Sequence, residues 1–427
     1  MDLLELNNWL GGFINFERRP DENMLNLSTM QTLCDFFGHP ESACPCFHVA
    51  GSKGKGTISH NIATILRCQG YKTGVYASPH VYHFTERIST GEAPFAEETY
   101  QKAEQELRLG VEELIKSGKL EQSIITWYEL VTVYAMLVFR LAKVDYAVYE
   151  VGMGGRLDCT NIIKPEAIAV GPIELEHTEY LGDTLEKIAT EKAGIFKEKV
   201  PIFSVAQKSA VRKVFDKATS AQSAKITYAL DLPDYRLADA SVAAAAVSAV
   251  TGFNGEDLIK ATQIAKDTEL PGRYEIVKNS QSIPFVLLDG AHTPNSITAT
   301  LARIKNNSPL DKLFSLGFTD KIRNANLIFA CAADKNVEEI ASLIAKSGLF
   351  NKIYLTRPGD FKKSDLPRAE QAFKEAIKTS GSSIALESSS DYRAIIKNAL
   401  SASASSNAPL IVLGSFYLLP EVKKLLK

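Results

Sequence analysis

The sequence is poor in cysteine, balanced in charge and free of long hydrophobic runs. Only six of its 427 residues are cysteines, and their spacing indicates neither a disulfide framework nor a four-ligand zinc site. Cys44 and Cys46 form a close pair, but no second pair of metal ligands accompanies them. We therefore do not predict a metal site at these cysteines.

Membranes and nucleic acids are not expected as partners. The most apolar run, 131–139, is far shorter than the roughly 20 residues of a spanning helix, and Glu129 and Arg140 flank it, which favours a buried helix. Lysine and arginine total 48 against 50 aspartates and glutamates, so no basic field exists to hold a phosphate backbone. The first ten residues have no basic stretch ahead of an apolar one, so we expect no secretory signal and a cytoplasmic protein.

Length and composition predict a globular enzyme of two domains. The 427 residues exceed the roughly 250 to 300 that one hydrophobic core supports. With 45% hydrophobic and 23% charged residues, the chain has an ordinary globular composition, which excludes disorder. We place the boundary at the Leu-Pro-Gly-Arg segment 270–273, after an alanine-rich helix around 243–249. The predicted domains are therefore 1–269 and 274–427, with 270–273 as the linker.

Short β-branched runs alternate with helical patterns in both predicted domains. This alternation is typical of an α/β fold, in which helices cover both faces of a parallel sheet. The predicted strands are 46–50, 73–76, 146–151, 167–170 and 201–205, then 286–288, 327–330, 352–355, 384–386 and 410–413. A helix is predicted over 337–346, and the Ser/Ala-rich segment 401–407 is predicted to be a loop.

A glycine-rich segment follows the predicted strand 46–50 and precedes a helical pattern that begins at Ile58. It reads Gly51-Ser52-Lys53-Gly54-Lys55-Gly56-Thr57. Glycines let successive backbone N–H groups turn toward an anion, and a helix start adds a favourable dipole. We predict a phosphate-binding loop in which Lys55 reaches the outer phosphates and Thr57 binds magnesium. Gly56 separates lysine from hydroxyl, unlike in the usual pattern, so a glycine-rich turn with solvated lysines is the alternative.

Glu150 ends the predicted strand 146–151 and precedes the flexible turn 152–156. Open α/β sheets bind ligands at the carboxyl ends of their strands, and a phosphate loop needs a carboxylate for its metal. We predict Glu150 as that ligand; the alternative is a strand glutamate with a structural partner. His177 follows the next strand and is a candidate second ligand, although an isolated histidine there is more often a hydrogen-bonded loop residue.

Lys192 shares the apolar face of a predicted helix with Ile188. A charged amine that points into a core must be paired, neutral or chemically altered. The alternative is a lysine whose amine snorkels to water.

These residues belong to a series of seven motifs, over nearly the whole chain, through which it resembles the folylpolyglutamate synthase and dihydrofolate synthase family of the Mur ligase superfamily. The motifs are HVAGSKGKGT (48–57), SPH (78–80) with ERI (86–88), EVGMGGRLDCTN (150–161), EHTEYLGDT (176–184), EKAGI (191–195), LPGR (270–273) and DGAHTPNS (289–296). Seven motifs in family order are more specific than any one of them.

The resemblance implies a Mur-ligase-type ATPase domain with a phosphate loop and a parallel central sheet, followed by a smaller Rossmann-like α/β domain. It implies an ATP-dependent amide ligase that adds L-glutamate to a pterin carboxylate through an acyl phosphate, giving ADP and phosphate. The acid would be dihydropteroate, tetrahydrofolate polyglutamates or both. The implied cofactors are ATP and Mg²⁺, and the implied state is a monomer.

The resemblance also implies roles for individual residues. Residues Gly51, Ser52, Lys53, Gly54, Lys55, Gly56 and Thr57 match the phosphate loop. Thr57 and Glu150 match the ligands of one magnesium ion, and Glu150, His177 and Lys192 match a second metal site in which the family's lysine is carbamylated. Lys55, Glu150, His177 and Lys192 are therefore the implied catalytic residues.

Two further groups follow from the same resemblance. Arg273, Asp289 and His292 match residues that contact the nucleotide. Ser78, Pro79 and His80, together with Arg156 and Asp158, match regions that line the pterin-side cleft.

The chain departs from the family pattern at several positions. Glu176 stands where aspartate is common, Thr293 where asparagine is common, and Ser52-Lys53 where Thr-Asn is usual; the segment 308–324 is longer and less regular than expected.

Two other functions are weighed against the folate ligase. One is a Mur-type ligase for a different acid and amine, because a fold does not fix a substrate. The other is a nucleotide-binding relative that no longer catalyses ligation.

Overall fold

The computed structural model describes residues 3–15, 27–232, 234–277, 283–306, 313, 322–360 and 362–426. The chain divides into two compact units, 1–268 (the first unit) and 269–427 (the second unit). Of the segment 308–324, only 313 and 322–324 are among the described residues. Within the described ranges, no helix combines the length and the apolar character needed to cross a membrane.

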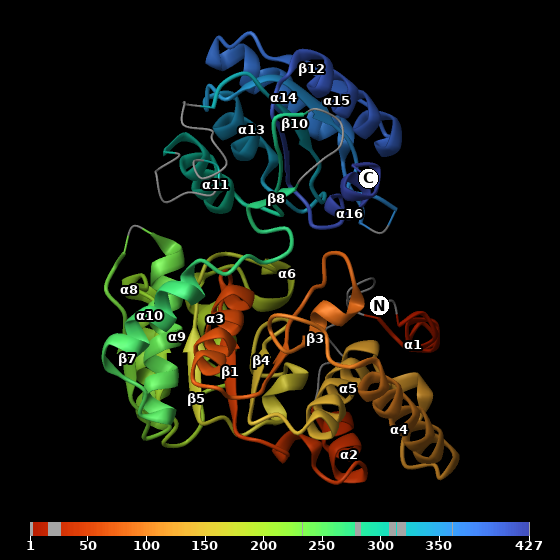
Figure 1. Cartoon of the computed structure of the whole chain (residues 1–427), viewed down its shortest axis with the longest axis vertical. Coiled ribbons are helices and arrows are strands. Elements are labelled where there is room, and N and C mark those ends of the chain that lie inside the picture. The colour runs from red at the N-terminus through yellow and green to blue at the C-terminus, as the bar shows by residue number, and fades with distance from the viewer. Residues whose placement is uncertain are drawn as a thin grey trace. The chain divides into compact units, whose positions relative to one another are not determined.

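The first unit is built on a seven-stranded sheet in the order β3-β2-β4-β1-β5-β6-β7. Figure 1 labels β1, β3, β4, β5 and β7 of this sheet. Its strands are β1 (Cys46–Ala50), β2 (Thr73–Tyr76), β3 (Ile88–Ser89), β4 (Tyr146–Glu150), β5 (Ala167–Val170), β6 (Ile202–Ser204) and β7 (Ile226–Tyr228). All neighbouring strands are parallel except β2 and β3. The five strands predicted here are confirmed, whereas β3 and β7 were not predicted.

Helices cover both faces of this sheet. They are α1 (Leu4–Leu10), α2 (Ser28–Phe36), α3 (Lys55–Cys68), α4 (Glu97–Lys116), α5 (Trp127–Ala142), α6 (Thr178–Leu181), α7 (Leu185–Ala193), α8 (Ser209–Ala221), α9 (Tyr235–Thr251) and α10 (Gly255–Lys266). Short 3₁₀ turns add η2 (Pro40–Ser42), η3 (Phe84–Arg87), η4 (Gln122–Ile124) and η5 (Cys159–Ile162).

Successive side chains of β1 point to opposite faces of the sheet, so they pack against different helices. Phe47 and Val49 belong to the apolar core formed with α3 and α9, whereas Ala50 belongs to the core formed with α7 and α8. A third core surrounds α5, whose apolar run is buried as predicted. This helix begins at a capping box, in which Thr126 and Glu129 each accept from the other's backbone N–H.

The second unit contains a six-stranded sheet in the order β12-β11-β10-β13-β9-β8. Figure 1 labels β8, β10 and β12 of this sheet. Its strands are β8 (Glu275–Val277), β9 (Val286–Leu288), β10 (Ala325–Phe329), β11 (Phe350–Leu355), β12 (Ala385–Ser388) and β13 (Leu410–Leu413). Only β8 runs antiparallel to its neighbour. The helices are α11 (Pro294–Asn306), α13 (Val337–Ala345), α14 (Leu366–Ser380), α15 (Tyr392–Ser406) and α16 (Leu419–Leu425). The five strands predicted here are confirmed.

The predicted loop at 401–407 is wrong, because helix α15 continues to Ser406. Ile396, Ala399, Leu400 and Ser403 are all buried, so the apolar helical period runs on into the serine-rich segment. The hydroxyl of Ser403 accepts a hydrogen bond from the buried Asn326 amide at 2.9 Å, which explains a serine on the buried face. Asn407, in the left-handed conformation, ends the helix.

Candidate active site

The glycine-rich segment forms a tight loop between β1 and α3. Gly51 and Gly54 have φ angles of +147° and +75°, and Gly54 is the N-cap of α3. A Cβ on Gly51 would lie 3.0 Å from the backbone of Gly171, and a Cβ on Gly54 would lie 2.9 Å from Asp239 Oδ2. Only glycine fits both places, and the first turn of α3, which contains Gly56 and Thr57, starts directly behind the loop.

The loop that follows β5 is tied to this segment. Ser52 N donates to Pro172 O at 2.9 Å, while Ser52 Oγ donates to Glu174 O at 3.1 Å and accepts from Glu174 N at 3.0 Å. These bonds fix the path of the chain toward Glu176 and His177. Ser52 therefore joins the glycine-rich loop to the loop that follows β5.

Two lysines converge on one carbonyl oxygen of the loop. Lys55 Nζ and Lys192 Nζ donate to Gly51 O at 3.1 and 3.0 Å. Lys192 lies on α7, is only 1% exposed and also pairs with Glu176 Oε1 at 2.8 Å. The predicted burial of Lys192 is confirmed, and its amine is paired within the protein instead of reaching water.

Burial and neighbouring charge shift the pKa values of this pair in the same direction. Burial lowers the pKa of Lys192 to about 8, with Lys55 adding to the effect and Glu176 opposing it. Burial would raise the pKa of Glu176, but Lys55, Lys192 and Lys53 outweigh it and lower that pKa to about 2. Glu176 is thus a carboxylate at neutral pH, whereas Lys192 is mostly an ammonium with a minor fraction of neutral amine.

Glu150 ends β4 and is 4% exposed. Its Oε2 accepts a hydrogen bond from Ser78 N at 3.0 Å. The same oxygen would lie 3.6 Å from a Cβ placed on Gly56, so the carboxylate lies against the first turn of α3. Glu150 thus connects the loop after β2 with the phosphate loop.

The donor chemistry here fits magnesium in part. Glu150 and Thr57 offer hard oxygen donors, which Mg²⁺ prefers. His177 is exposed at the N-cap of α6, with a φ of +46°. Lys192 as an ammonium cannot bind a cation, so it fits a metal only if the amine is chemically altered. In the described part of the chain, no three His, Cys, Asp or Glu side chains gather in a metal-binding arrangement.

The predicted substrate-side residues have distinct environments. His80 is half-buried, and its Nδ1 accepts from Arg87 Nε at 2.8 Å. Arg156 is exposed and pairs with Glu191 of α7 at 3.0 Å. Asp158 is buried, and its carboxylate accepts from the N–H groups of residues 152, 153 and 160 and from the Thr160 hydroxyl. The carboxylate of Asp158 therefore holds the turn after β4 in place.

Arg273, Asp289 and His292 lie in the second unit. Asp289 accepts from Tyr274 N and Ala291 N, and burial raises its pKa although Arg273 opposes that shift. The Arg273 guanidinium lies 4.0 Å from the centroid of the Phe416 ring, and the His292 ring packs edge-on against the same ring at 6.1 Å. Arg273 and His292 thus share Phe416 as a neighbour, and Asp289 lies close enough to Arg273 for that charge to act on its pKa.

Comparison with known proteins agrees with this architecture. Residues 49–280, more than half of the chain, match the Mur ligase middle domain, and residues 272–416 match the Mur ligase glutamate ligase domain. The dihydrofolate synthase/folylpolyglutamate synthase of Escherichia coli is 33% identical over 324 residues, which cover 70% of this chain and 72% of that protein. The chain belongs to the dihydrofolate synthase/folylpolyglutamate synthase family of Mur ligases.

Other members of this family match over nearly the whole chain. The Bacillus subtilis dihydrofolate synthase/folylpolyglutamate synthase is 28% identical and covers 99% of both chains. An Escherichia coli family structure, solved in complex with DHPP and ADP, is 25% identical, covers 98% of this chain and 97% of its own, and has a TM-score of 0.75. The α/β fold and the ligase class predicted from the resemblance are confirmed.

Several residues that contact the predicted site residues were not predicted from the sequence. Asp239 on α9 is buried beside Gly54, and burial raises its pKa well above the usual value. Phe416 and Trp127 carry no local signal that marks them. Arg87 was part of the ERI motif, yet nothing in the sequence shows that it contacts His80. Such contacts join segments that are distant in the chain, so periodicity cannot reveal them.

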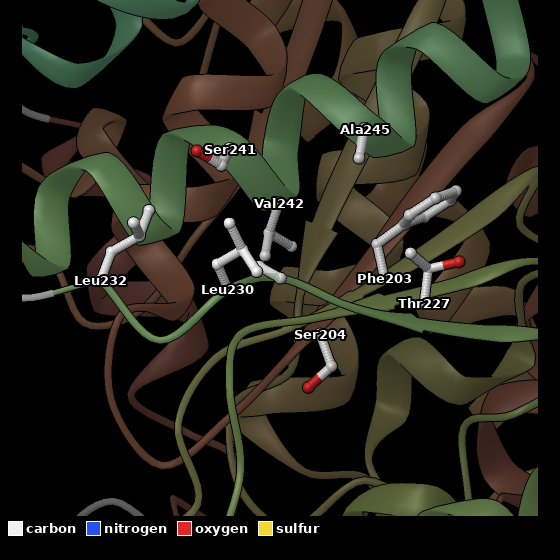
Figure 2. Close-up of a pocket in the computed structure, with 9 residues that line it drawn as sticks. Phe203, Ser204, Thr227, Leu230, Leu232, Ser241, Val242 and Ala245 are labelled. Carbon is white, nitrogen blue, oxygen red and sulfur yellow. The ribbon is translucent and has the colours of Figure 1, made fainter.

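A hollow of about 230 Å³ lies elsewhere in the first unit, between α9 and the strands β6 and β7. Figure 2 shows Ser241, Val242 and Ala245 on the helix above Phe203 and Thr227 of the strands. None of the residues predicted for phosphate, metal or substrate binding lines it. We therefore assign it no part in the family's reaction.

Proposed function

We propose that this protein is an ATP-dependent ligase that joins L-glutamate to the carboxylate of dihydropteroate, of a reduced folate, or of both. The observation that carries the proposal is the convergence of Lys55 and Lys192 on Gly51 O, with Glu150 against the first turn of α3. The names of the relatives and the DHPP and ADP bound by the Escherichia coli protein support the choice of substrates.

In the first step, a carboxylate oxygen of the acid attacks the γ-phosphate of ATP and ADP leaves. Two anions must approach one another, which costs electrostatic energy. Lys55 and the N–H groups at the start of α3 would offset this repulsion and the charge that develops on the phosphoryl oxygens. A magnesium ion held by Thr57 and Glu150 would supply further positive charge at the phosphates.

In the second step, the amine of glutamate attacks the acyl carbon of the acyl phosphate. A C–N bond forms and the amine loses one proton, while the C–O bond to the phosphate breaks and the phosphate leaves with an oxygen that came from the acid. Arg273, Asp289 and His292 remain proposed nucleotide contacts. Ser78, Pro79, His80 and Arg156 remain proposed residues of the acid site, and Asp158 keeps the turn beside them in shape.

For Lys192 we propose a carbamate. Its lowered pKa leaves a fraction of neutral amine at neutral pH, and a neutral amine adds CO₂ with release of one proton. The product is a carboxylate-like group, which together with Glu150 and His177 would hold a second metal ion. In the unmodified form, Glu176 neutralises the ammonium.

The direct test supplies purified protein with ATP, magnesium and glutamate, together with either dihydropteroate or tetrahydrofolate. ADP and the mass of the product are followed together, because ADP alone could arise from uncoupled hydrolysis. A glutamate-extended product from either acid is the expected result, and products from both would make the enzyme bifunctional. Folded, ATP-binding protein that yields neither product would contradict the proposal.

We also propose that the enzyme acts as a monomer in the cytoplasm. Size-exclusion chromatography with light scattering at micromolar concentration is expected to give the mass of one chain, 46.8 kDa. A stable dimer would contradict the first part of this statement.

A further inference from the structure

The loop that carries His80 is fixed at both ends. At its start, Ser78 N donates to Glu150 Oε2 at 3.0 Å. At its end, the Glu86 carboxylate accepts three backbone hydrogen bonds, from Val81 N at 2.7 Å and from Tyr82 N and His83 N at 2.9 Å. The loop is therefore tied down at both ends, and its first residue touches a proposed magnesium ligand.

A buried arginine lies behind the His80 ring. Arg87 is only 1% exposed, and its Nε donates to His80 Nδ1 at 2.8 Å. Its guanidinium carbon lies 4.8 Å from the centroid of the Trp127 ring, at the first residue of α5. Packing against an aromatic face in the core holds the guanidinium in place.

This contact decides which nitrogen of His80 bears the proton. An arginine N–H can only donate, so His80 Nδ1 must accept, and in a neutral ring the proton is then on Nε2. Burial, Arg87 and His83 together lower the pKa of His80 to about 3, so the ring is neutral near pH 7. The His80 residue as a whole is half-buried, so it is not closed off entirely from solvent.

We propose that Arg87 is a positioning residue that holds His80 as a neutral Nε2–H tautomer, and that this N–H donates a hydrogen bond to the carboxylate of the acid substrate. The second half rests on the proposed function. A neutral donor suits a carboxylate that must act as a nucleophile. It orients the oxygen, whereas an imidazolium would pair with the carboxylate and lower its basicity.

The tautomer is tested by ¹⁵N NMR of the imidazole rings in the full chain, with His80 assigned through the His80→Gln variant. The expected result near pH 7 is a protonated Nε2 and an unprotonated, hydrogen-bonded Nδ1. Arg87→Met is expected to mix the two tautomers. A proton on Nδ1 in the wild-type protein, or one fixed Nε2–H tautomer in folded Arg87→Met, would overturn the positioning role.

Kinetics test the donor independently, including the case in which Arg87→Met does not fold. His80→Leu removes the N–H donor, whereas His80→Gln places an amide N–H near the position of Nε2. The KM for the acid is expected to rise about tenfold or more in His80→Leu and clearly less in His80→Gln, because a bond to a charged acceptor contributes about 1.5 to 3 kcal/mol. The KM for ATP should change less than about twofold, a limit below the effect of one hydrogen bond.

Equal KM values for the acid in the two His80 variants would overturn the donor role. Wild-type protein without turnover on any pterin acid would instead refute the proposed function, and the NMR result would still decide the Arg87–His80 relation. The two failures are therefore distinguishable.

Discussion

At the scale of single residues, Lys192 and Glu150 carry the chemistry of the proposed site. Lys192 is buried, bonded to the phosphate loop and paired with Glu176, so its charge is balanced before any ligand arrives. Glu150 is equally buried but lies against the first turn of the helix that follows the loop. Their different partners give the two residues different roles, which substitution can separate.

Lys192→Ala is expected to reduce turnover by about a hundredfold or more, because it removes the side chain that the carbamate, a proposed metal ligand, is formed on. Formate or acetate should restore part of the activity, since a small carboxylate can replace a carbamate. Product formation is measured with and without the additive, and thermal melting confirms the fold. Lys187→Ala, on the same helix but in an exposed pair with Asp183, is the control. Full activity of Lys192→Ala without additive would exclude the carbamate.

Glu150→Gln keeps the shape of the side chain and an oxygen that accepts from Ser78 N. We expect a melting temperature close to that of the wild type. Turnover should fall about a hundredfold, because a neutral amide is a poor magnesium ligand. Rates are measured over a magnesium titration. An unchanged rate and magnesium requirement would remove Glu150 from the metal site.

The sequence predicted where two residues of the proposed site lie in the fold, but it did not predict their contacts. The burial of Lys192 followed from helical spacing, and the place of Glu150 followed from the end of a strand. The contact of Arg87 with His80 was not predictable, because it depends on how a loop folds back over a distant helix. Glu176 was noticed only as a departure from the family, yet it is the direct partner of Lys192.

At the scale of elements, the phosphate loop is shaped by close approaches of its backbone. Gly54 has a φ of +75°. A Cβ added to Gly54 would also lie only 2.9 Å from the Asp239 side chain. Gly70, at the end of the same β-α unit, has a φ of +87° and nothing within 4 Å of a Cβ. The two glycines therefore share a left-handed backbone but differ in the space available for a Cβ.

Gly54→Ala and Gly70→Ala form a matched pair. Each should cost about 1 to 2 kcal/mol for the left-handed backbone. Because Asp239 must move, Gly54→Ala should lower the melting temperature further than Gly70→Ala does. It should also weaken ATP binding at least tenfold. Melting and calorimetric titration with ATP measure both effects. Equal ATP affinity in the two variants would show that the Gly54 turn does not shape the nucleotide site.

The strand β1 also contains a buried histidine that makes stability depend on pH. His48 Nε2 lies 2.8 Å from Thr160 Oγ1, and burial, aided by Lys197, lowers the pKa of His48 to about 3. In the unfolded chain its pKa is near 6.5. Between these values the unfolded state binds the proton and the folded state does not, so acid favours unfolding.

We expect His48 to lower the free energy of unfolding by about 1.4 kcal/mol per pH unit as pH falls from about 6.5 toward 3. His48→Gln keeps an N–H near the Nε2 position but cannot titrate. Denaturant unfolding of both proteins at pH 7.5, 6 and 5 measures the difference. Parallel pH profiles of wild type and variant would contradict a neutral, buried His48.

The element boundaries show where sequence patterns suffice. All ten predicted strands exist, because each is a compact apolar run bounded by turn residues. The end of α15 was missed, since serine and alanine are read as a linker unless the burial of Ser403 beside Asn326 is known. Tertiary contacts, not local propensity, extend that helix.

At the scale of the whole molecule, length, alternation and motif order led to the correct fold class. The two sheets differ in strand order, and neither order is readable from the sequence, because strand pairing depends on long-range crossovers. The family's motifs therefore carried most of the functional inference, and the geometry added the lysine pair, the Glu150 contact and the Arg87–His80 bond.

The central claim is that the carboxylate of the acid is phosphorylated before glutamate attacks it. The most direct measurement uses dihydropteroate or tetrahydrofolate polyglutamate with ¹⁸O at both oxygens of the reacting carboxylate, and mass spectrometry of the phosphate released with ADP. The account predicts one ¹⁸O atom in each phosphate and a glutamate-extended product. Unlabelled phosphate would contradict an acyl-phosphate intermediate, and with it the reaction proposed for this site.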